Sequence, residues 1–150
     1  MRRAATDATW DDDRSGRPRV VLECPPAGSP QIVARAIERH GYEVRICEGP
    51  DRRHQCPLVH DGACALVNGA DVVVNLLGTD PGDPAADVLP AVAGERRPPA
   101  IVSDRAPADD HAHRVVITDR PLTTGGLIGA IGEALADRDR PAAIWGDGFC

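Results

Sequence analysis

The chain contains no lysine and few aromatic residues. All 17 basic side chains are arginine, and the aromatics are two Trp, one Tyr and one Phe. Without lysine, the chain cannot form the Gly-Lys-Ser/Thr phosphate loop of P-loop nucleotide-binding proteins. We attribute the all-arginine composition to codon bias and not to mechanism. Because aromatics are scarce, the core must be built from Val, Ile, Leu and Ala.

Long apolar runs and a dinucleotide-binding fingerprint are also missing. No run approaches the ~18–20 residues that cross a bilayer, and no apolar segment follows Arg2 and Arg3 as in a signal peptide. The turn after the first apolar strand has only Gly28, so the G-x-G-x-x-G pattern is absent. We therefore expect a cytoplasmic protein with no membrane partner. Its five cysteines, an odd number, argue against a disulfide framework.

The charge distribution argues against a further class of partner. The formal net charge is −6, and residues 1–19 hold five Arg against four Asp, which leaves about −7 on the rest of the chain. This net negative charge repels the phosphate backbone of a nucleic acid. We therefore expect no nucleic acid partner.

Patterning divides the 150 residues into three regions around one domain. Residues 1–18 mix Arg with Asp and lack hydrophobic periodicity, so we expect a disordered leader. Its three consecutive acids, Asp11, Asp12 and Asp13, are interpreted as solvated and not as a metal site. Residues 19–138 form the domain, and residues 139–150 form a C-terminal tail.

Short apolar segments alternate with amphipathic ones along this domain. Five segments have the composition of strands, namely residues 19–24, 42–47, 70–78, 99–104 and 114–118. Helices are expected over residues 30–40 (burying Ile32, Val33, Ala36 and Ile37), over 58–67 in broken form, over 85–93, and over 124–137 (burying Leu127, Ile128, Ile131 and Leu135). This alternation predicts an α/β fold, a flavodoxin-like/CheY-like doubly wound five-stranded parallel sheet of order 2-1-3-4-5. Residues 105–113 leave little room, so the fourth helix should be shortened.

The central strand, residues 70–78, indicates where on this sheet a functional site is expected. In open α/β sheets, ligands bind just outside the carboxyl ends of the strands. Asn75 occupies that position in the central strand and is the first candidate functional residue.

The strand ends together resemble those of a response-regulator receiver domain. In that family the first strand ends in two acids that hold Mg²⁺, the third in a phosphate-accepting Asp, the fourth in Thr or Ser, and the fifth in Lys-Pro. The corresponding residues here are Glu23 and Cys24, Asn75, Ser103, and Arg120 with Pro121. The resemblance covers about residues 19–138.

Two departures from the family pattern change what the resemblance implies. An amide such as that of Asn75 cannot form an acyl phosphate, which needs a carboxylate nucleophile. Mg²⁺ requires oxygen ligands, and Cys24 replaces one of them. The resemblance therefore implies a degenerate pseudo-receiver, in which Mg²⁺ binding is weakened or lost and no other cofactor is expected. The spacing also makes Glu23 and Arg120 candidates for an ion pair across the pocket.

From this pattern we expect a receiver-like signal-transduction module, related to phosphorelay proteins, that acts by protein–protein interaction without Asp phosphorylation. No nucleophile with a matched base is recognisable, so we do not expect an enzyme. No output domain follows residue 138, so the expected partner is a separate signalling protein; a homodimer is also compatible with the family. Asp80 and Asp83, in the loop after the central strand, are alternative phosphate acceptors, although their spacing to Pro and Gly favours a turn-forming role.

Three other features keep different functions open. His54, Cys56, His60 and Cys64 lie within 11 residues and could bind Zn²⁺, or Cys56 and Cys64 could form a reversible disulfide, in a metal- or thiol-based sensor. Against this, the spacing lacks the tight pairs of zinc fingers, and Cys64 suits a core position. Cys24 is interpreted as an inert apolar filler, with a redox role as its alternative. A third possibility is a small-ligand-binding flavodoxin-like domain that uses the helix start at Gly125 and Gly126.

Overall fold

The structure, a computed structural model, describes Trp10 and residues 16–51, 54–77, 82–92, 98–103, 114–117 and 123–138. Its five strands are β1 (Arg19–Glu23), β2 (Glu43–Cys47), β3 (Val72–Asn75), β4 (Ala100–Ser103) and β5 (Arg114–Ile117). They form one sheet of order β2-β1-β3-β4-β5, in which every pairing is parallel. The predicted flavodoxin-like, CheY-like fold is confirmed.

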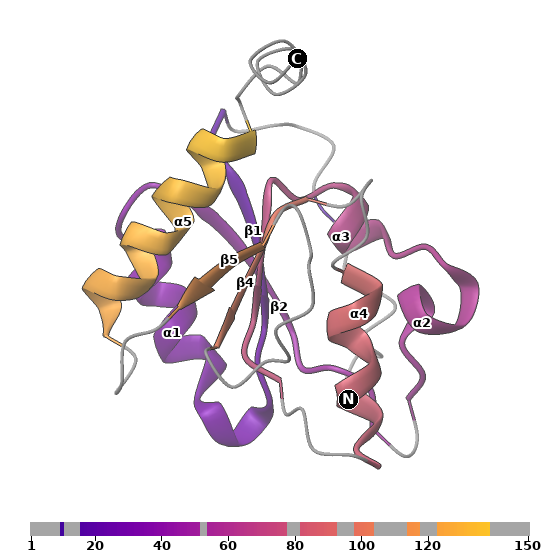
Figure 1. Cartoon of the computed structure of the whole chain (residues 1–150). Helices are drawn as coiled ribbons and strands as arrows, with labels where there is room; N and C mark the ends of the chain where they lie inside the picture. Colours follow the sequence, from indigo (N-terminus) through magenta and orange to yellow (C-terminus); the bar gives the residue numbers. More distant parts are fainter. Residues whose placement is uncertain are drawn as a thin grey trace, which may run out of the picture.

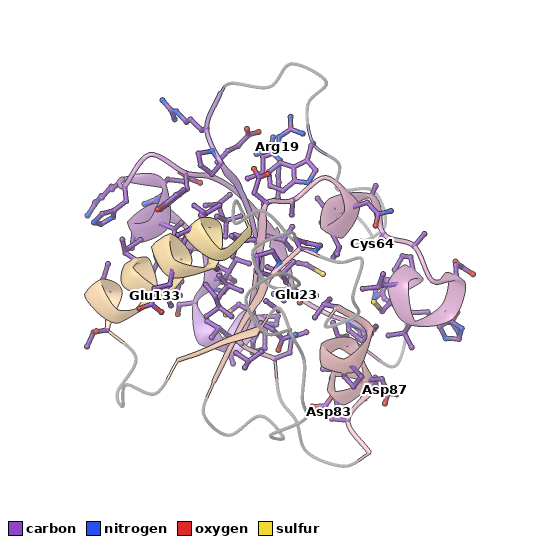
Figure 2. The ribbon with its side chains drawn as sticks, turned by 45° about the horizontal axis from the view of Figure 1, so that its top comes forward. Arg19, Glu23, Cys64, Asp83, Asp87 and Glu133 are labelled. Carbon is purple, nitrogen blue, oxygen red and sulfur yellow. The ribbon has the colours of Figure 1, made fainter. Side chains whose placement is uncertain are left out.

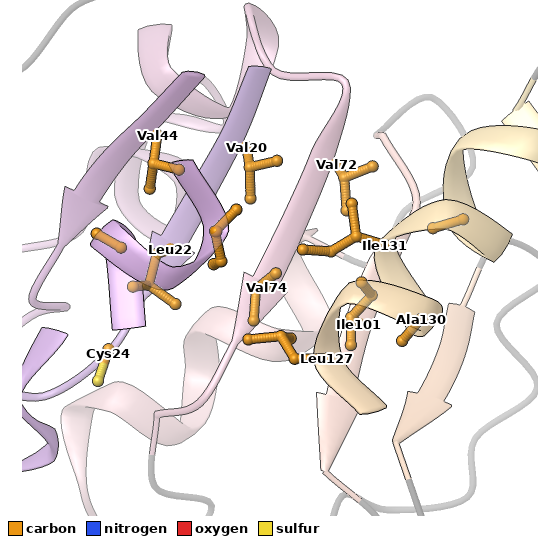
Figure 3. Packing of buried hydrophobic residues seen from close by; sticks show 13 residues of the cluster. Val20, Leu22, Cys24, Val44, Val72, Val74, Ile101, Leu127, Ala130 and Ile131 are labelled. Atoms are coloured by element: carbon orange, nitrogen blue, oxygen red, sulfur yellow. The ribbon is translucent and has the colours of Figure 1, made fainter. Parts of the chain in front are cut away.

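The two central strands are buried along their whole length, as their continuous apolar composition predicts. Side chains alternate between the two faces of the sheet. Val20 and Leu22 of β1 therefore join one hydrophobic cluster, and Val21 joins the other. Figure 3 shows the first cluster, where residues of β1 and β3 meet Leu127 and Ile131.

Helices cover both faces of the sheet and complete three layers (Figure 1). One face carries α1 (Pro30–Glu38) and α5 (Thr124–Arg138). The other carries α2 (Pro57–Asp61), α3 (Ala65–Asn68) and α4 (Val88–Val92), the last preceded by the 3₁₀ turn η3 (Pro84–Asp87). A further 3₁₀ turn, η2 (Pro26–Gly28), links β1 to α1. In the described residues no helix has the length and apolarity needed to cross a bilayer.

The predicted helices agree with these elements in most respects. The segment 58–67 is indeed broken, because Gly62 ends α2 with a φ of 76° before α3 begins. In α5, Leu127 and Ile131 are buried, while Ile128 and Leu135 pack partly against the same cluster. The shortened helix expected over 105–113 and the tail 139–150 lie outside the described residues.

The predicted inner face of α1 is wrong at one position. Ile32 is 71% exposed, whereas Pro30, Ala34 and Ile37 are buried, and Val33 and Ala36 are half-buried. A helix turns about 100° per residue, so Ile32 lies about 200° from Pro30 and points away from the sheet. The apolar composition of the segment was sufficient to predict the helix but not the direction of each side chain.

Trp10 lies against the body of the domain, although it belongs to the predicted disordered leader. Its indole Nε1 donates a hydrogen bond to the carbonyl of Leu66 at 2.8 Å. The guanidinium groups of Arg19 and Arg45 lie 5.2 and 5.5 Å from the ring centroid. Gly69 provides the room for the ring, since a Cβ at that position would lie 2.5 Å from Trp10 Cδ1. This residue therefore attaches the N-terminal segment to the α3 side of the sheet.

Candidate functional site

The carboxyl ends of β1 and β3 bring two predicted site residues into contact. Glu23 and Asn75 are the last residues of their strands and face each other in the parallel register. Asn75 Nδ2 donates a hydrogen bond to Glu23 Oε1 at 3.1 Å. Both residues are buried, with 3% and 4% exposure, and Figure 2 shows Glu23 in the middle of the domain. This pair is a buried polar contact between the ends of the two strands.

Burial shifts the protonation equilibrium of the Glu23 carboxyl group. Desolvation raises the pKa of Glu23 to about 7, and the hydrogen bond from Asn75 opposes part of that rise. An amide at position 75 supplies an N–H donor, whereas a carboxylate there would place a second negative charge against Glu23. The site therefore holds at most one negative charge, and near neutral pH it holds less than one on average.

Cys24 does not complete this pair. The alternation of side chains places it in the hydrophobic cluster under α1 and α5, whereas Glu23 faces the α2 and α3 side. Its thiol is 2% exposed and donates a hydrogen bond to the carbonyl of Pro25 at 3.5 Å. Burial raises the pKa of this thiol, and Glu48 raises it further. These surroundings support the interpretation of Cys24 as an apolar filler.

The remaining predicted site residues are described only in part. Ser103 ends β4, where its backbone pairs with Ile117 of β5. Arg120, Pro121 and Asp80 lie outside the described residues, so the ion pair between Glu23 and Arg120 stays a prediction. Asp83 is exposed, and its Oδ1 accepts a hydrogen bond from the backbone N–H of Ala85 at 2.9 Å at the start of η3. That contact supports the turn-forming role.

The four Cys and His residues of the 54–64 segment are divided between two environments. His54 is exposed and its Nδ1 lies 3.0 Å from Asp51 Oδ1, and His60 is exposed on α2. Cys56 and Cys64 are half-buried and precede α2 and α3. Across the ranges that the structure describes, no three His, Cys, Asp or Glu side chains are grouped so that they could hold a metal ion. The segment thus does not present the proposed four-ligand set.

A small cavity beside Glu23 is lined by Cys47 of β2 together with two cysteines of the 54–64 segment. Cys47, Cys56 and Cys64 line it together with Glu23, and Leu58, Leu66 and Val67 contribute apolar walls. Its volume of about 20 Å³ is room for about one water molecule, so it does not accommodate an organic ligand. Burial raises the pKa of the Cys47 thiol to about 12 and also raises that of Cys56.

Cys47 is a member of this group that spacing along the chain did not predict. The signal was available, because Cys47 is the last residue of β2 and pairs in register with Glu23. Combining the predicted strand order with the strand ends would have placed it there. Spacing along the chain instead favoured His54 and His60, which are near in sequence but face solvent.

The start of α5 is the third predicted binding feature. The backbone N–H of Gly126 donates to the hydroxyl of Thr123 at 3.0 Å, which caps the helix from within the chain. The Gly126 N–H, one of the groups that would bind an anion, therefore already has a hydrogen-bond partner within the chain. This contact does not support the helix start as a ligand site.

Comparison with known proteins gives structural similarity only. No protein-family model and no curated protein matches the sequence. One similar solved structure is a response regulator receiver domain protein from Bacillus halodurans, with 14% identity and a TM-score of 0.47 over 84% of this chain and 99% of that one. Another is a fusion that carries amino acids 181–211 of the yeast Spc42 trimeric coiled coil, with 16% identity and a TM-score of 0.49 over 93% of this chain and 91% of that one. Likeness at these values assigns neither a family nor an activity, and the receiver-like fold rests on the order and direction of the strands.

Proposed function

We propose that this chain is a pseudo-receiver, a receiver-like signalling module that acts by protein–protein interaction without Asp phosphorylation. The observation that carries the proposal is the buried hydrogen bond between Asn75 and Glu23 at the carboxyl edge of the sheet. It places an amide where the resemblance to receiver domains implies a phosphate-accepting carboxylate.

The chemistry of the pair opposes phosphoryl transfer in three ways. The amide of Asn75 has no carboxylate oxygen to attack phosphorus. Glu23 is the only carboxyl group in the buried pair, and Mg²⁺ prefers several oxygen ligands in near-octahedral geometry. The pKa of Glu23, raised to about 7, further weakens its charge for a cation. The described pair therefore offers Mg²⁺ a single carboxyl group, and Asn75 offers a phosphoryl group no acceptor.

A module of this kind passes information through its surface, so we propose a separate signalling protein as its partner. The protein is proposed to be cytoplasmic and to have no enzymatic activity of its own. A homodimer is the second assembly to test. Sedimentation equilibrium at several concentrations distinguishes a stable dimer from a monomer that needs another protein.

Acetyl phosphate tests the absence of phosphorylation directly. The purified chain is incubated with Mg²⁺ and acetyl phosphate and analysed by intact mass spectrometry, beside an active receiver domain that shows the reagent to be competent. We expect no phosphoryl adduct on this chain. An adduct on the wild-type protein would refute the proposal, and its loss in Asp80→Ala but not in Asp83→Ala would identify the true acceptor.

A further inference from the structure

Three thiols from three separate elements meet at the cavity beside Glu23. Cys47 ends β2, Cys56 precedes α2, and Cys64 precedes α3. All three are free cysteines in the structure. Figure 2 labels Cys64 and Glu23 in this region of the domain. We call Cys47, Cys56 and Cys64 the pocket thiols.

Two of the pocket thiols, Cys47 and Cys56, have raised pKa values. Burial is the largest cause of the raised pKa of Cys47, and charges on Glu23, Cys64 and Cys56 raise it further. Glu23 and Cys64 also raise the pKa of Cys56, after burial. Crowding negative charge at this place is therefore unfavourable. A disulfide is uncharged, so it is compatible with the apolar walls of this cavity.

Backbone positions distinguish which two pocket thiols can approach. Cys47 is fixed within the sheet, since its strand pairs with β1 and its carbonyl accepts a hydrogen bond from the N–H of Cys24 at 3.0 Å. Cys56 and Cys64 instead occupy extended positions just before short helices of five and four residues. Gly62, with a φ of 76°, makes the turn between those helices. This segment can adjust without breaking a pairing of the sheet.

We propose that Cys56 and Cys64 form a reversible disulfide in this cavity when the protein meets a hydroperoxide. The modification would fasten α2 to α3 on the sheet face next to Glu23. This inference stands on the cavity and the pocket thiols, and it does not depend on the proposed pseudo-receiver function.

The reaction balances with hydrogen peroxide as the oxidant. The sulfur of one thiol attacks a peroxide oxygen and the O–O bond breaks. The thiol proton passes to the leaving oxygen, so a sulfenic acid and one water are formed. The sulfur of the second cysteine then attacks the sulfenic sulfur, forms the S–S bond, loses its proton and releases a second water. Two thiols and one peroxide thus give one disulfide and two waters. A dithiol reductant reverses the change by thiol–disulfide exchange.

Peptide mapping of the full chain tests the proposal. The reduced protein is treated with hydrogen peroxide, remaining thiols are alkylated, and proteolytic peptides are identified by mass spectrometry before and after dithiothreitol. We expect a linked pair containing Cys56 and Cys64 that disappears on reduction. A link through Cys24, Cys47 or Cys150, irreversible oxidation without a link, or no reaction would each overturn the proposal.

Variants provide the matched control. Cys56→Ala and Cys64→Ala should each abolish the linked peptide, whereas Cys24→Ala, which removes a buried thiol on the opposite face, should leave its yield unchanged. In the wild-type chain, oxidation should slow hydrogen exchange of residues 57–68 several-fold, and unchanged exchange would contradict the proposed fastening. The acetyl phosphate result is independent of either outcome, so the two proposals can fail separately.

Discussion

At the scale of single residues, the Asn75 amide allows a carboxyl group to remain buried between two strands. Glu23 Oε1 accepts the Nδ2–H bond at 3.1 Å, and both side chains are nearly inaccessible to solvent. Burying an unpaired polar group costs about 1–3 kcal/mol, so the pair is stable only when donor and acceptor match. The amide of Asn75 therefore stabilises this edge of the sheet.

Asn75→Asp should destabilise the protein by about 1–3 kcal/mol at pH 8, because it replaces the donor with a second acid beside Glu23. The loss should be smaller at pH 5, where the two carboxyl groups can share a proton. Urea unfolding at both pH values measures it. Gln31→Glu, an amide-to-acid change at an exposed site on α1, is the control and should change stability by less than about 1 kcal/mol. Equal effects of the two substitutions would show that the buried pair has no special role.

At the scale of elements, one aromatic ring from the N-terminal segment packs on the body of the domain. Trp10 contributes a hydrogen bond to Leu66, two cation–π contacts and packing against Gly69. Each cation–π contact contributes about 0.5–1 kcal/mol. A segment with no hydrophobic periodicity can thus place one residue against the domain, which periodicity cannot reveal.

Gly69→Ala provides a test of this attachment. The added Cβ would lie 2.5 Å from Trp10 Cδ1, so the ring must move, and stability should fall by about 1–2 kcal/mol. In a Trp10→Ala background, which itself should cost about 2–3 kcal/mol, the same substitution should be nearly neutral. Chemical denaturation of the wild type, the two single variants and the double variant gives the coupling free energy between positions 69 and 10. Additive effects would mean that Gly69 and Trp10 do not interact.

Helix α5 carries three glycines with open space around them in the part of the chain that the structure describes. A Cβ at Gly125, Gly129 or Gly132 would meet none of the described heavy atoms within 4 Å. Gly129→Ala should therefore stabilise the protein by about 0.5–1 kcal/mol, because alanine has less backbone freedom to lose in a helix. Thermal unfolding should show a higher Tm, and a lower Tm would indicate a contact at that surface that the structure does not include.

At the scale of the whole molecule, the sheet was predictable because its information is local and redundant. Val20–Leu22 and Val72–Val74 are continuous apolar runs, and only a strand buried on both faces requires them. Once the strand order is known, the edge position of Glu23 and Asn75 follows from register. The positions of Ile32 and Cys47 were harder to predict. The direction of the Ile32 side chain depends on the rotation of the helix about its axis, and the neighbours of Cys47 depend on the strand order. Trp10 depends on a single tertiary contact, and no pattern along the chain encodes it.

The buried carboxyl of Glu23 should make the stability of the whole molecule depend on pH. Its pKa rises from 4.5 to about 7 on folding, so between these values the folded protein keeps a proton that the unfolded chain has lost. The resulting stabilisation is complete below pH 4.5 and disappears as pH rises through 7. One pKa unit corresponds to about 1.4 kcal/mol, so the contribution is about 3 kcal/mol.

Glu23→Gln isolates this effect, because the amide keeps an oxygen to accept the Asn75 hydrogen bond and cannot ionise. The free energy of unfolding should fall between pH 5 and pH 8 by about 3 kcal/mol more in the wild type than in Glu23→Gln. Urea unfolding of both proteins at each pH measures the difference, and the other titrating groups cancel in it. The Cys47 thiol, with a pKa of about 12, stays protonated over this range and does not imitate the signal. Parallel pH profiles for the two proteins would mean that Glu23 ionises without cost, which a carboxyl group enclosed between β1 and β3 should not do.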